Sequence, residues 1–329
     1  MTERTRRVFR LIDVCVAAVI AVLLLAILVP ALTRVPPGEF RVTCLNHQKN
    51  LGTALINYEG RKGRFPGWRE QIGAAESPKS ASWVFVLLPD LDRNDLYRAY
   101  GQGGIRFGFD PTEAMDLLIC PQDESAHVRD APTSFAVNSG MPDAWISPLD
   151  SATRTGDLAA NGIFHDLDPL WLRPLGNAEK KLTIVTSNYV AAHDGTTSTI
   201  LLSDRVEAGN WPQYGNRTTP GENITGIVWQ NDLPPPAGSL HPEARINGLR
   251  PPAAESFTDV NHVRPSSFHP GGVVVTFADG HTRFISDQID YLVYALLMTP
   301  HGAAARDPET DRPVRAEFRE TALTDEMLQ

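Results

Sequence analysis

The beginning of the chain differs from the rest in the pattern of its apolar positions. Residues 11–32 read LIDVCVAAVIAVLLLAILVPAL, with Asp13 as the one charged residue. Such a run is long enough to cross the hydrocarbon core of a bilayer, and it is apolar on every side, unlike an amphipathic core helix. The pattern predicts a transmembrane helix over residues 11–32, and a cleaved secretory signal is the alternative. Residues 1–10 are predicted to be a basic leader that stays in the cytoplasm, because they contain Arg4, Arg6, Arg7 and Arg10.

After this run, short elements separated by turn-rich loops are predicted. Apolar residues at helical spacing predict a helix over residues 39–58. The preceding Pro36-Pro37-Gly38 is predicted to kink or break a helix that leaves the membrane, because proline lacks an N–H and clashes with the preceding turn. Long loops with short strands are predicted at 121–180, and a long loop at 205–262. The other predicted elements are a strand, a proline break and a short helix within 82–100, strands at 188–192 and 199–203, and a helix at 289–298.

The clearest local pattern is a hairpin near the end of the chain. Two strand-like runs, residues 273–278 and 281–285, are separated by Asp279-Gly280. Asp-Gly between such runs is typical of a two-residue type I′ turn, in which both central residues have positive φ. In that register Val275 faces Phe284. Four apolar side chains are then predicted to share one face of the hairpin: Val273, Val275, Phe277 and Phe284.

Composition narrows the classes of protein that fit this pattern. The chain has 329 residues, of which 42% are hydrophobic and 21% charged, so it can bury a core. Its 25 glycines and 26 prolines favour a turn-rich mixed or mostly β architecture over a helical bundle. The 30 Lys and Arg against 39 Asp and Glu give a net charge of -9. Nucleic acid is therefore not expected as a partner, because binding phosphates needs a surplus of basic residues.

Three cysteines exclude a disulfide-dense scaffold and a four-cysteine zinc site. Cys15 lies inside the predicted span and is interpreted as a small apolar residue. Cys44 and Cys120 lie in the predicted ectodomain, where an oxidising compartment permits a Cys44–Cys120 disulfide. Closing a loop of that size would stabilise the fold by about 4 kcal/mol through the chain entropy it removes. Two free buried thiols are the alternative.

The hairpin also contains the pattern that relates the chain to a known family. A histidine, nine further residues and then Asp-Gly occur as His269 to Asp279-Gly280, with Gly271 and Gly272 after the histidine. With this signature the chain resembles the DUF1559 family of bacterial pilin-like proteins, and the resemblance extends over residues 6–302. Blocks that fit the same family are Cys44-Leu45-Asn46, Arg64-Phe65-Pro66, Ser82-Trp83, Cys120-Pro121, Ser187-Asn188-Tyr189 and Asp194-Gly195-Thr196.

The resemblance implies an α+β, pilin-like fold. After the transmembrane helix, the helix at 39–58 is expected to pack along an antiparallel sheet that includes the 188–203 strands and the hairpin, with long loop insertions. The ectodomain is expected to cover residues 33–302. Residues 303–329 are charged and lack apolar periodicity, so they are predicted to be a solvated, disordered tail.

The resemblance also bears on how the N-terminus is processed. Prepilin signals have a glycine before a phenylalanine and a glutamate four residues after that phenylalanine. The matching positions here are Val8, Phe9 and Asp13. Because prepilin peptidases need the small residue before the cut, Val8 is predicted to slow or block cleavage, and the anchor is predicted to be retained.

No catalytic residues and no cofactor are predicted. The chain lacks the nucleophile-elbow, zincin, P-loop and dinucleotide-binding motifs. His269 and Asp279 lie at opposite ends of one strand, roughly 33 Å apart along an extended chain, so they cannot share an ion. They are interpreted, with Gly271, Gly272 and Gly280, as structural residues. A Ca²⁺ site in the Asp-rich loops is an alternative, although no loop shows alternating oxygen ligands.

Three functional classes follow. The first is a pseudopilin-like structural or assembly protein of the cytoplasmic membrane, with its ectodomain in the periplasm or outside the cell and other pilin-like subunits or a secretion machinery as partners. The second is a membrane-tethered binding module for glycan or protein ligands. The third is a metal-dependent hydrolase, for which no motif is present. The second class would use aromatic residues of the loops, which are Trp171, Trp211, Tyr214 and Trp229.

Overall fold

The computed structural model describes residues 14–25, 37–73, 79–102, 113–142, 144–147, 152–154, 157–168, 182–206, 208–212, 226–231, 245–248, 263–308 and 310–328. Its contacts divide the chain into two compact units, Met1–Phe40 and Arg41–Gln329. The first unit contains a helix at residues 14–25. Among the described residues, no helix is both long enough and apolar enough to span a membrane. Val8, Phe9 and Asp13, and residues 26–32 of the expected span, lie outside the described residues.

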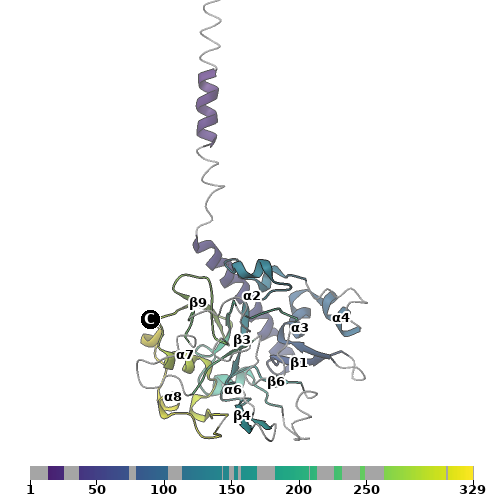
Figure 1. Ribbon diagram of the computed structural model, residues 1–329, viewed down its shortest axis with the longest axis vertical. Coiled ribbons are helices and arrows are strands. Elements are labelled where there is room, and N and C mark those ends of the chain that lie inside the picture. The colour runs from purple at the N-terminus through teal and green to yellow at the C-terminus, as the bar shows by residue number, and fades with distance from the viewer. Residues whose placement is uncertain are drawn as a thin grey trace, which may run out of the picture. The chain divides into compact units, whose positions relative to one another are not determined.

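Helix α2, Pro37–Lys62, is the longest described helix (Figure 1). It includes the helix predicted at 39–58 and begins at Pro37, where the missing N–H of proline has no intrahelical partner to lose. One face of the helix is buried, at spacings of three and four residues that return to the same side of an α-helix. The residues of that face are Cys44, Gln48, Leu51, Leu55 and Tyr58.

A five-stranded sheet of order β10-β9-β7-β3-β8 forms the centre of the second unit. Three of its four pairings are antiparallel, and β3 pairs with β8 in parallel. The predicted strand at 199–203 and the predicted hairpin are both part of this sheet. The mixed α+β class with mainly antiparallel pairing is thus confirmed. The strands are β3 Phe135–Gly140, β7 Ile200–Asp204, β8 Gly226–Val228, β9 Gly272–Phe277 and β10 Thr282–Ser286.

Strand β9 is buried on both faces, so it has apolar side chains at successive positions. Val274 belongs to a core with Leu51 and Leu55 of α2. Val273 and Val275 belong to a second core with residues of helix α7, Tyr291–Met298. The sheet therefore has α2 residues packed on one face and α7 residues on the other.

Shorter elements surround this centre. The remaining strands are β1 Arg69–Ile72, β2 Lys79–Ser82 and β6 Asp166–Leu167 in one sheet, and β4 Ala144–Ser147 with β5 Ala152–Arg154 in another. The other helices are α3 Trp83–Leu87, α4 Asn94–Gln102, α6 Ser187–Ala192 and α8 Ala316–Glu320. The 3-10 turns are η1 Leu88–Leu91, η3 Asp116–Leu118, η4 Glu124–Val128, η8 Gly302–Ala304 and η9 Asp325–Leu328.

The hairpin forms, but its register differs from the prediction by one residue. Phe284 lies opposite Val274, not Val275. The connection is a three-residue loop, because Phe277 pairs with His281 and the Gly280 N–H donates to Phe277 O at 2.8 Å. Only Gly280 in the loop has positive φ, at 88°. This is a type I turn followed by a left-handed glycine. A one-residue slip moves a side chain to the other face, so Phe284 packs on the α2 side of the sheet.

Two predicted strands are helices in the structure. Residues 188–192 lie in α6, because the Thr186 side chain accepts the Tyr189 N–H and caps the helix. The apolar run predicted as a strand after Ser82 is α3, which is buried on every side. Full burial removes the alternation that separates a strand from a helix in sequence.

The C-terminal tail also differs from the prediction. Residues 310–328 are described, and they include helix α8. Phe318 of this helix is 2% exposed and packs on Trp229 at 5.6 Å between ring centroids. A single buried aromatic in a charged segment has no periodicity to predict it.

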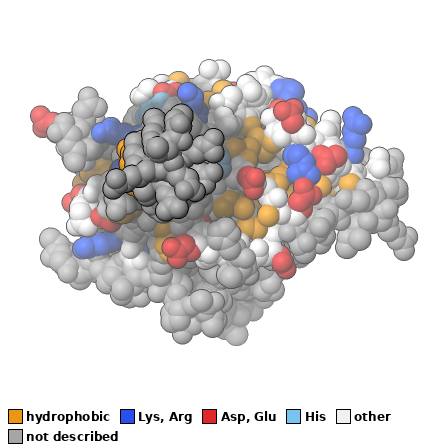
Figure 2. Space-filling view, turned by 90° about the horizontal axis from the view of Figure 1, so that it is seen from above, with side chains coloured by type: hydrophobic (Ala, Val, Ile, Leu, Met, Phe, Trp, Pro, Cys, Tyr) orange, Lys and Arg blue, Asp and Glu red, His pale blue; other side chains and the backbone are white. Residues whose placement is uncertain are grey.

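The surface of the second unit mixes both signs of charge. In the view of Figure 2, blue and red side chains lie next to one another around the apolar groups. Arg61 pairs with Asp90, and Arg93 with Asp95 and Glu113. Such exposed pairs contribute little to stability.

Candidate functional site

Four chemically reactive side chains meet in the interior of the second unit. They are Cys44, Cys120, Asp204 and His269, and their ligand atoms all lie within 4.8 Å of one another. Each of the four residues is at most 2% exposed. We call this group the buried cluster.

Helix α2 and strand β7 form one half of the buried cluster. Cys44 and Gln48 are four residues apart, so both side chains leave the same face of α2. Both donate to Oδ1 of Asp204, the last residue of β7: the Cys44 thiol at 3.0 Å and the Gln48 amide at 2.8 Å. The other carboxylate oxygen, Oδ2, accepts the Val274 N–H at 2.7 Å. The Asp204 carboxylate is therefore held at both oxygens.

The loop that follows η3 places Cys120. Ile119, the residue before Cys120, is held against α2, because Nδ1 of the α2 residue His47 lies 3.0 Å from Ile119 O. The Cys120 carbonyl accepts the Asp123 N–H at 2.8 Å. Asp123 is in turn fixed by Arg129 at 2.7 Å, so the loop is held on both sides of the cysteine.

The turn before β9 places His269. Ser267 Oγ accepts the His269 N–H at 3.0 Å and donates to Gly272 O at 2.6 Å. Gly271 has a φ of 81°, a conformation that favours glycine. A Cβ on Gly272 would lie 2.0 Å from Ile285 O, so only glycine fits where β9 meets β10. The two glycines of the signature thus shape the turn that directs the imidazole inward.

The His269 imidazole joins the two halves of the buried cluster. Its Nε2 lies 3.4 Å from Cys120 Sγ and 3.7 Å from Asp204 Oδ2. Burial lowers the pKa of His269, but its contact with Cys120 and the charge of Asp204 outweigh burial, so the pKa is raised. The neighbouring Cys44 thiol and His269 lower the pKa of Cys120 to about 5, against the effect of burial.

The pKa values of Cys44 and Asp204 are raised, whereas that of Cys120 is lowered. Burial raises the pKa of the Cys44 thiol, and the adjacent Cys120 and Asp204 raise it further. Burial also raises the pKa of Asp204 to about 7, with the charge of Cys120 adding to the effect. Without a cation, the cluster thus favours a Cys120 thiolate beside an imidazolium, with a protonated Cys44.

A thiolate beside an imidazole is also the arrangement of a cysteine nucleophile and its base. A nucleophile must reach its substrate, however, and the cluster is closed to solvent. Structural zinc sites are closed sets of four ligands, most often sulfur and imidazole nitrogen, and carboxylate oxygen also binds zinc.

The other end of β9 is unlike the buried cluster. Asp279 lies in the hairpin loop and accepts the His281 N–H at 3.0 Å and contacts His281 Nδ1 at 2.6 Å. The Asp279 and His281 side chains are 31% and 42% exposed. His269 and Asp279 therefore belong to different environments, as their separation along one strand predicts.

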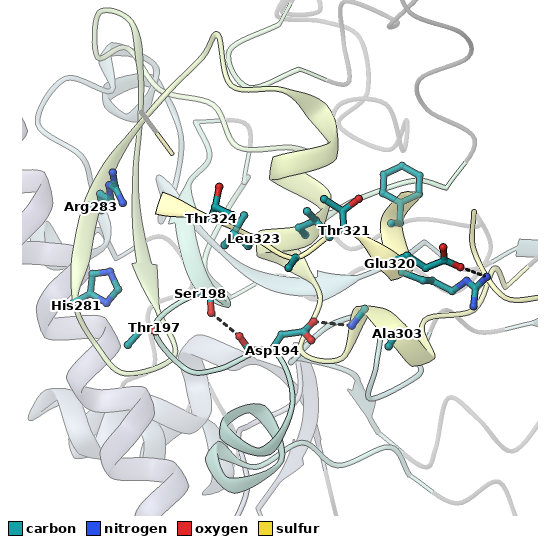
Figure 3. Close-up of a pocket in the computed structure, with 15 residues that line it drawn as sticks. Asp194, Thr197, Ser198, His281, Arg283, Ala303, Glu320, Thr321, Leu323 and Thr324 are labelled. Carbon is teal, nitrogen blue, oxygen red and sulfur yellow. Dashed lines mark hydrogen bonds and ion pairs between the residues drawn. The ribbon is translucent and has the colours of Figure 1, made fainter. Parts of the chain in front are cut away.

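A pocket on the surface is the second candidate site (Figure 3). It has a volume of about 660 Å³ and is lined by residues of β10, η8 and the C-terminal segment. Figure 3 shows His281 on one side, Glu320 on the other and Asp194 between them. The Asp194 carboxylate accepts the Gly302 N–H at 2.6 Å and so holds η8 in place. Among the lining residues described, no nucleophile is paired with a base.

A comparison with known protein families matches residues 41–292 to the family described as "Protein of unknown function (DUF1559)". The match covers more than half of the chain. The chain belongs to the DUF1559 family. No curated protein and no solved structure matches it. All four residues of the buried cluster lie inside the DUF1559 match.

The structure places the predicted site residues in two groups. Cys44 and Cys120 are free thiols and lie together in the buried cluster with His269. Asp279 and Gly280 form the hairpin loop. Trp211 and Trp229, two of the loop aromatics, are fully buried, while Trp171 and Tyr214 lie outside the described residues.

Sequence reasoning missed Asp204 and Gln48. Both are polar residues at positions that look ordinary in sequence: Asp204 ends an apolar strand and Gln48 lies in a polar stretch of a helix. The available signal was that Gln48 follows Cys44 by one helical turn, which places both side chains on one face.

Proposed function

We propose that this DUF1559 protein is a membrane-anchored, pilin-like structural or assembly protein, with its second unit outside the cytoplasm. The observation that carries the proposal is the apolar surface of the helix at residues 14–25. Of the described large apolar side chains that are exposed, most lie in this helix, among them Val14 at 65% and Leu24 at 61%. Such a surface needs a lipid or protein cover, because exposing it to water is unfavourable.

Two further features support an anchored, pilin-like protein. The described helix lies within the apolar run of residues 11–32, which is preceded by arginines. In the second unit, the long helix α2 packs its buried face on a mainly antiparallel sheet. This combination of helix and sheet is what the resemblance to pilin-like proteins implies.

A structural role fits the chemistry of the second unit better than catalysis does. The reactive groups of the second unit lie in the buried cluster, where each residue is at most 2% exposed. The alternative of a glycan-binding module loses support, because Trp211 and Trp229 serve the core.

Cys15 offers a direct test of anchoring and assembly. It is exposed on the helix at residues 14–25, whereas Cys44 and Cys120 are buried. We expect the full chain to remain in the membrane fraction after carbonate extraction. We also expect mild oxidation in membranes to cross-link two copies through Cys15, and Cys15→Ser to abolish the cross-link.

The possible failures of this test are distinct. Release of the protein by carbonate would overturn the anchor. Retention without a Cys15 cross-link would contradict helix-to-helix assembly and favour a lone tethered protein. Mass spectrometry of the N-terminus adds a third result, since a chain beginning at Phe9 would show that Val8 does not block cleavage.

A further inference from the structure

We propose that Cys44, Cys120, Asp204 and His269 bind one zinc ion, which ties α2 to the central sheet. The site is independent of the membrane anchor and of the assembly role. Zinc is the metal that the donor set favours, because two sulfurs, an imidazole nitrogen and a carboxylate oxygen make a four-coordinate set of the kind zinc takes in proteins.

The distances between the donor atoms suit a tetrahedral ion. Zinc bonds of about 2.0–2.3 Å place neighbouring ligand atoms about 3.3–3.8 Å apart. Cys120 Sγ and His269 Nε2 are 3.4 Å apart, and His269 Nε2 and Asp204 Oδ2 are 3.7 Å apart. All four donor atoms lie within 4.8 Å of one another.

The buried cluster contains acidic groups that a cation can hold in place of protons. Two thiols and a carboxylate lie in an interior where an unpaired negative charge is costly. Within the described part of the chain, the ion-pair partner of Asp204 is His269. A zinc ion replaces the thiol protons, which leave to solvent as the metal binds. Two thiolates and one carboxylate then face a divalent cation and a neutral imidazole.

The groups around the donors are arranged as they are around metal ligands. The carboxylate of Asp204 is oriented by Gln48 at Oδ1 and by the Val274 N–H at Oδ2. Gln48 also donates to Val274 O at 2.9 Å, so its amide is fixed. Such outer contacts orient metal ligands and contribute to metal affinity.

The zinc site explains more of the cluster than a Cys44–Cys120 disulfide does. A disulfide would use the two sulfurs and leave the Asp204 carboxylate outside the new bond. It would likewise give the His269 imidazole, 3.4 Å from Cys120 Sγ, no part in the bond. Zinc uses all four groups, which come from four separate segments of the chain.

The test begins with the full chain purified in detergent without chelators. We expect about one zinc per chain by elemental analysis, as a closed four-ligand site requires. Replacing zinc with Co²⁺ is expected to give sulfur-to-cobalt charge-transfer absorption and the visible bands of tetrahedral cobalt. This measurement needs no variant, so it does not depend on whether a cluster substitution folds.

Variants then assign the ligands. Cys120→Ser is expected to remove the sulfur-to-cobalt absorption or halve it, and Cys15→Ser, the matched control outside the cluster, to leave it unchanged. Gln48→Met keeps all four ligands and removes one contact to Asp204. It is expected to weaken zinc binding by about 10–100-fold, as measured by competition with a chromophoric chelator.

Three results would overturn the proposal. The first is a chain with no bound zinc that also takes up no Co²⁺ after reduction. The second is a mass lower by two hydrogens with Cys44 joined to Cys120, which would establish the disulfide instead. The third is a zinc content and cobalt spectrum that Cys120→Ser does not change, which would place the metal elsewhere.

Discussion

The two ends of strand β9 show how differently one signature is used. At the beginning, His269 is buried and meets side chains from α2, the Cys120 loop and β7. At the end, Asp279 is partly exposed and contacts His281 in its own hairpin loop. The histidine of the signature thus belongs to a cluster of residues distant in sequence, whereas the Asp-Gly pair ten residues later forms a local turn.

Residues that are close together in one sequence motif therefore need not share a site. The side-chain contacts of Asp279 reach His281, two residues along the chain, so local turn chemistry explains them. Contacts at the His269 end span 149 residues to Cys120, so they exist only once the tertiary fold is complete. Substitutions at the two ends are therefore expected to differ greatly in cost.

The largest effect is expected for Asp204→Ala. Removing the carboxylate leaves the Gln48 amide and the Val274 N–H buried without their acceptor, which is expected to lower the free energy of unfolding by about 3–5 kcal/mol. Urea denaturation of the full chain in detergent measures the change. Asp204→Asn, which keeps one acceptor oxygen, is expected to lose less. Equal costs for Asp204→Ala and Asp279→Ala would contradict the comparison.

Gly272→Ala is expected to have the next largest effect. Its Cβ would lie 2.0 Å from Ile285 O, so β9 and β10 must separate, at a cost of about 2–3 kcal/mol. Gly271→Ala is the matched control, since that Cβ meets nothing within 4 Å and only the φ of 81° is unfavourable. The control is expected to cost about 1 kcal/mol. Thermal melts measure both variants. A lower melting temperature for Gly272→Ala than for Gly271→Ala would support the close packing at Gly272, and the reverse order would contradict it.

At the other end of the strand, Gly280→Ala is expected to cost about 1–2 kcal/mol, because its φ of 88° is unfavourable for alanine. The new Cβ also approaches Ile56 Cδ1, at 2.8 Å, which is the flexible end of a side chain. Zinc content is expected to stay at the wild-type level. A loss of metal in this variant would show that the hairpin loop and the buried cluster are coupled.

The smallest effect is expected for Asp279→Asn. Asparagine keeps an oxygen that accepts the His281 N–H and suits the same turn position, and the side-chain contact with His281 that it alters is partly exposed. The change in unfolding free energy is expected to be under about 0.5 kcal/mol. A large loss of stability, or of metal binding, would assign Asp279 a role beyond the turn.

The sequence predicted the elements whose signals are local. Apolar spacing located α2, α7 and the β9–β10 hairpin. The hairpin register was wrong because Asp-Gly suits both a two-residue loop and a three-residue loop, and only tertiary packing selects between them. The strand predicted at 188–192 was wrong because Tyr189 and Val190 favour strands, while the cap at Thr186 favours the helix that forms.

The buried cluster was predictable only in part. The compartment predicts a Cys44–Cys120 disulfide with two free buried thiols as the alternative, and the structure has both as free thiols in one cluster. Asp204 could not be recognised, because a carboxylate after an apolar strand is usually the start of a turn. Its role depends on α2 crossing β7, which brings together residues 160 positions apart.

The most direct test of the account is the zinc content of His269→Gln and Asp279→Asn, purified side by side and checked for cooperative melting. The two substitutions alter the two ends of the same signature. We predict that Asp279→Asn keeps about one zinc per chain, as wild type does, and that His269→Gln loses most of it. Equal zinc content in the two variants, whether retained or lost, would contradict the claim that the ends of β9 have separate roles.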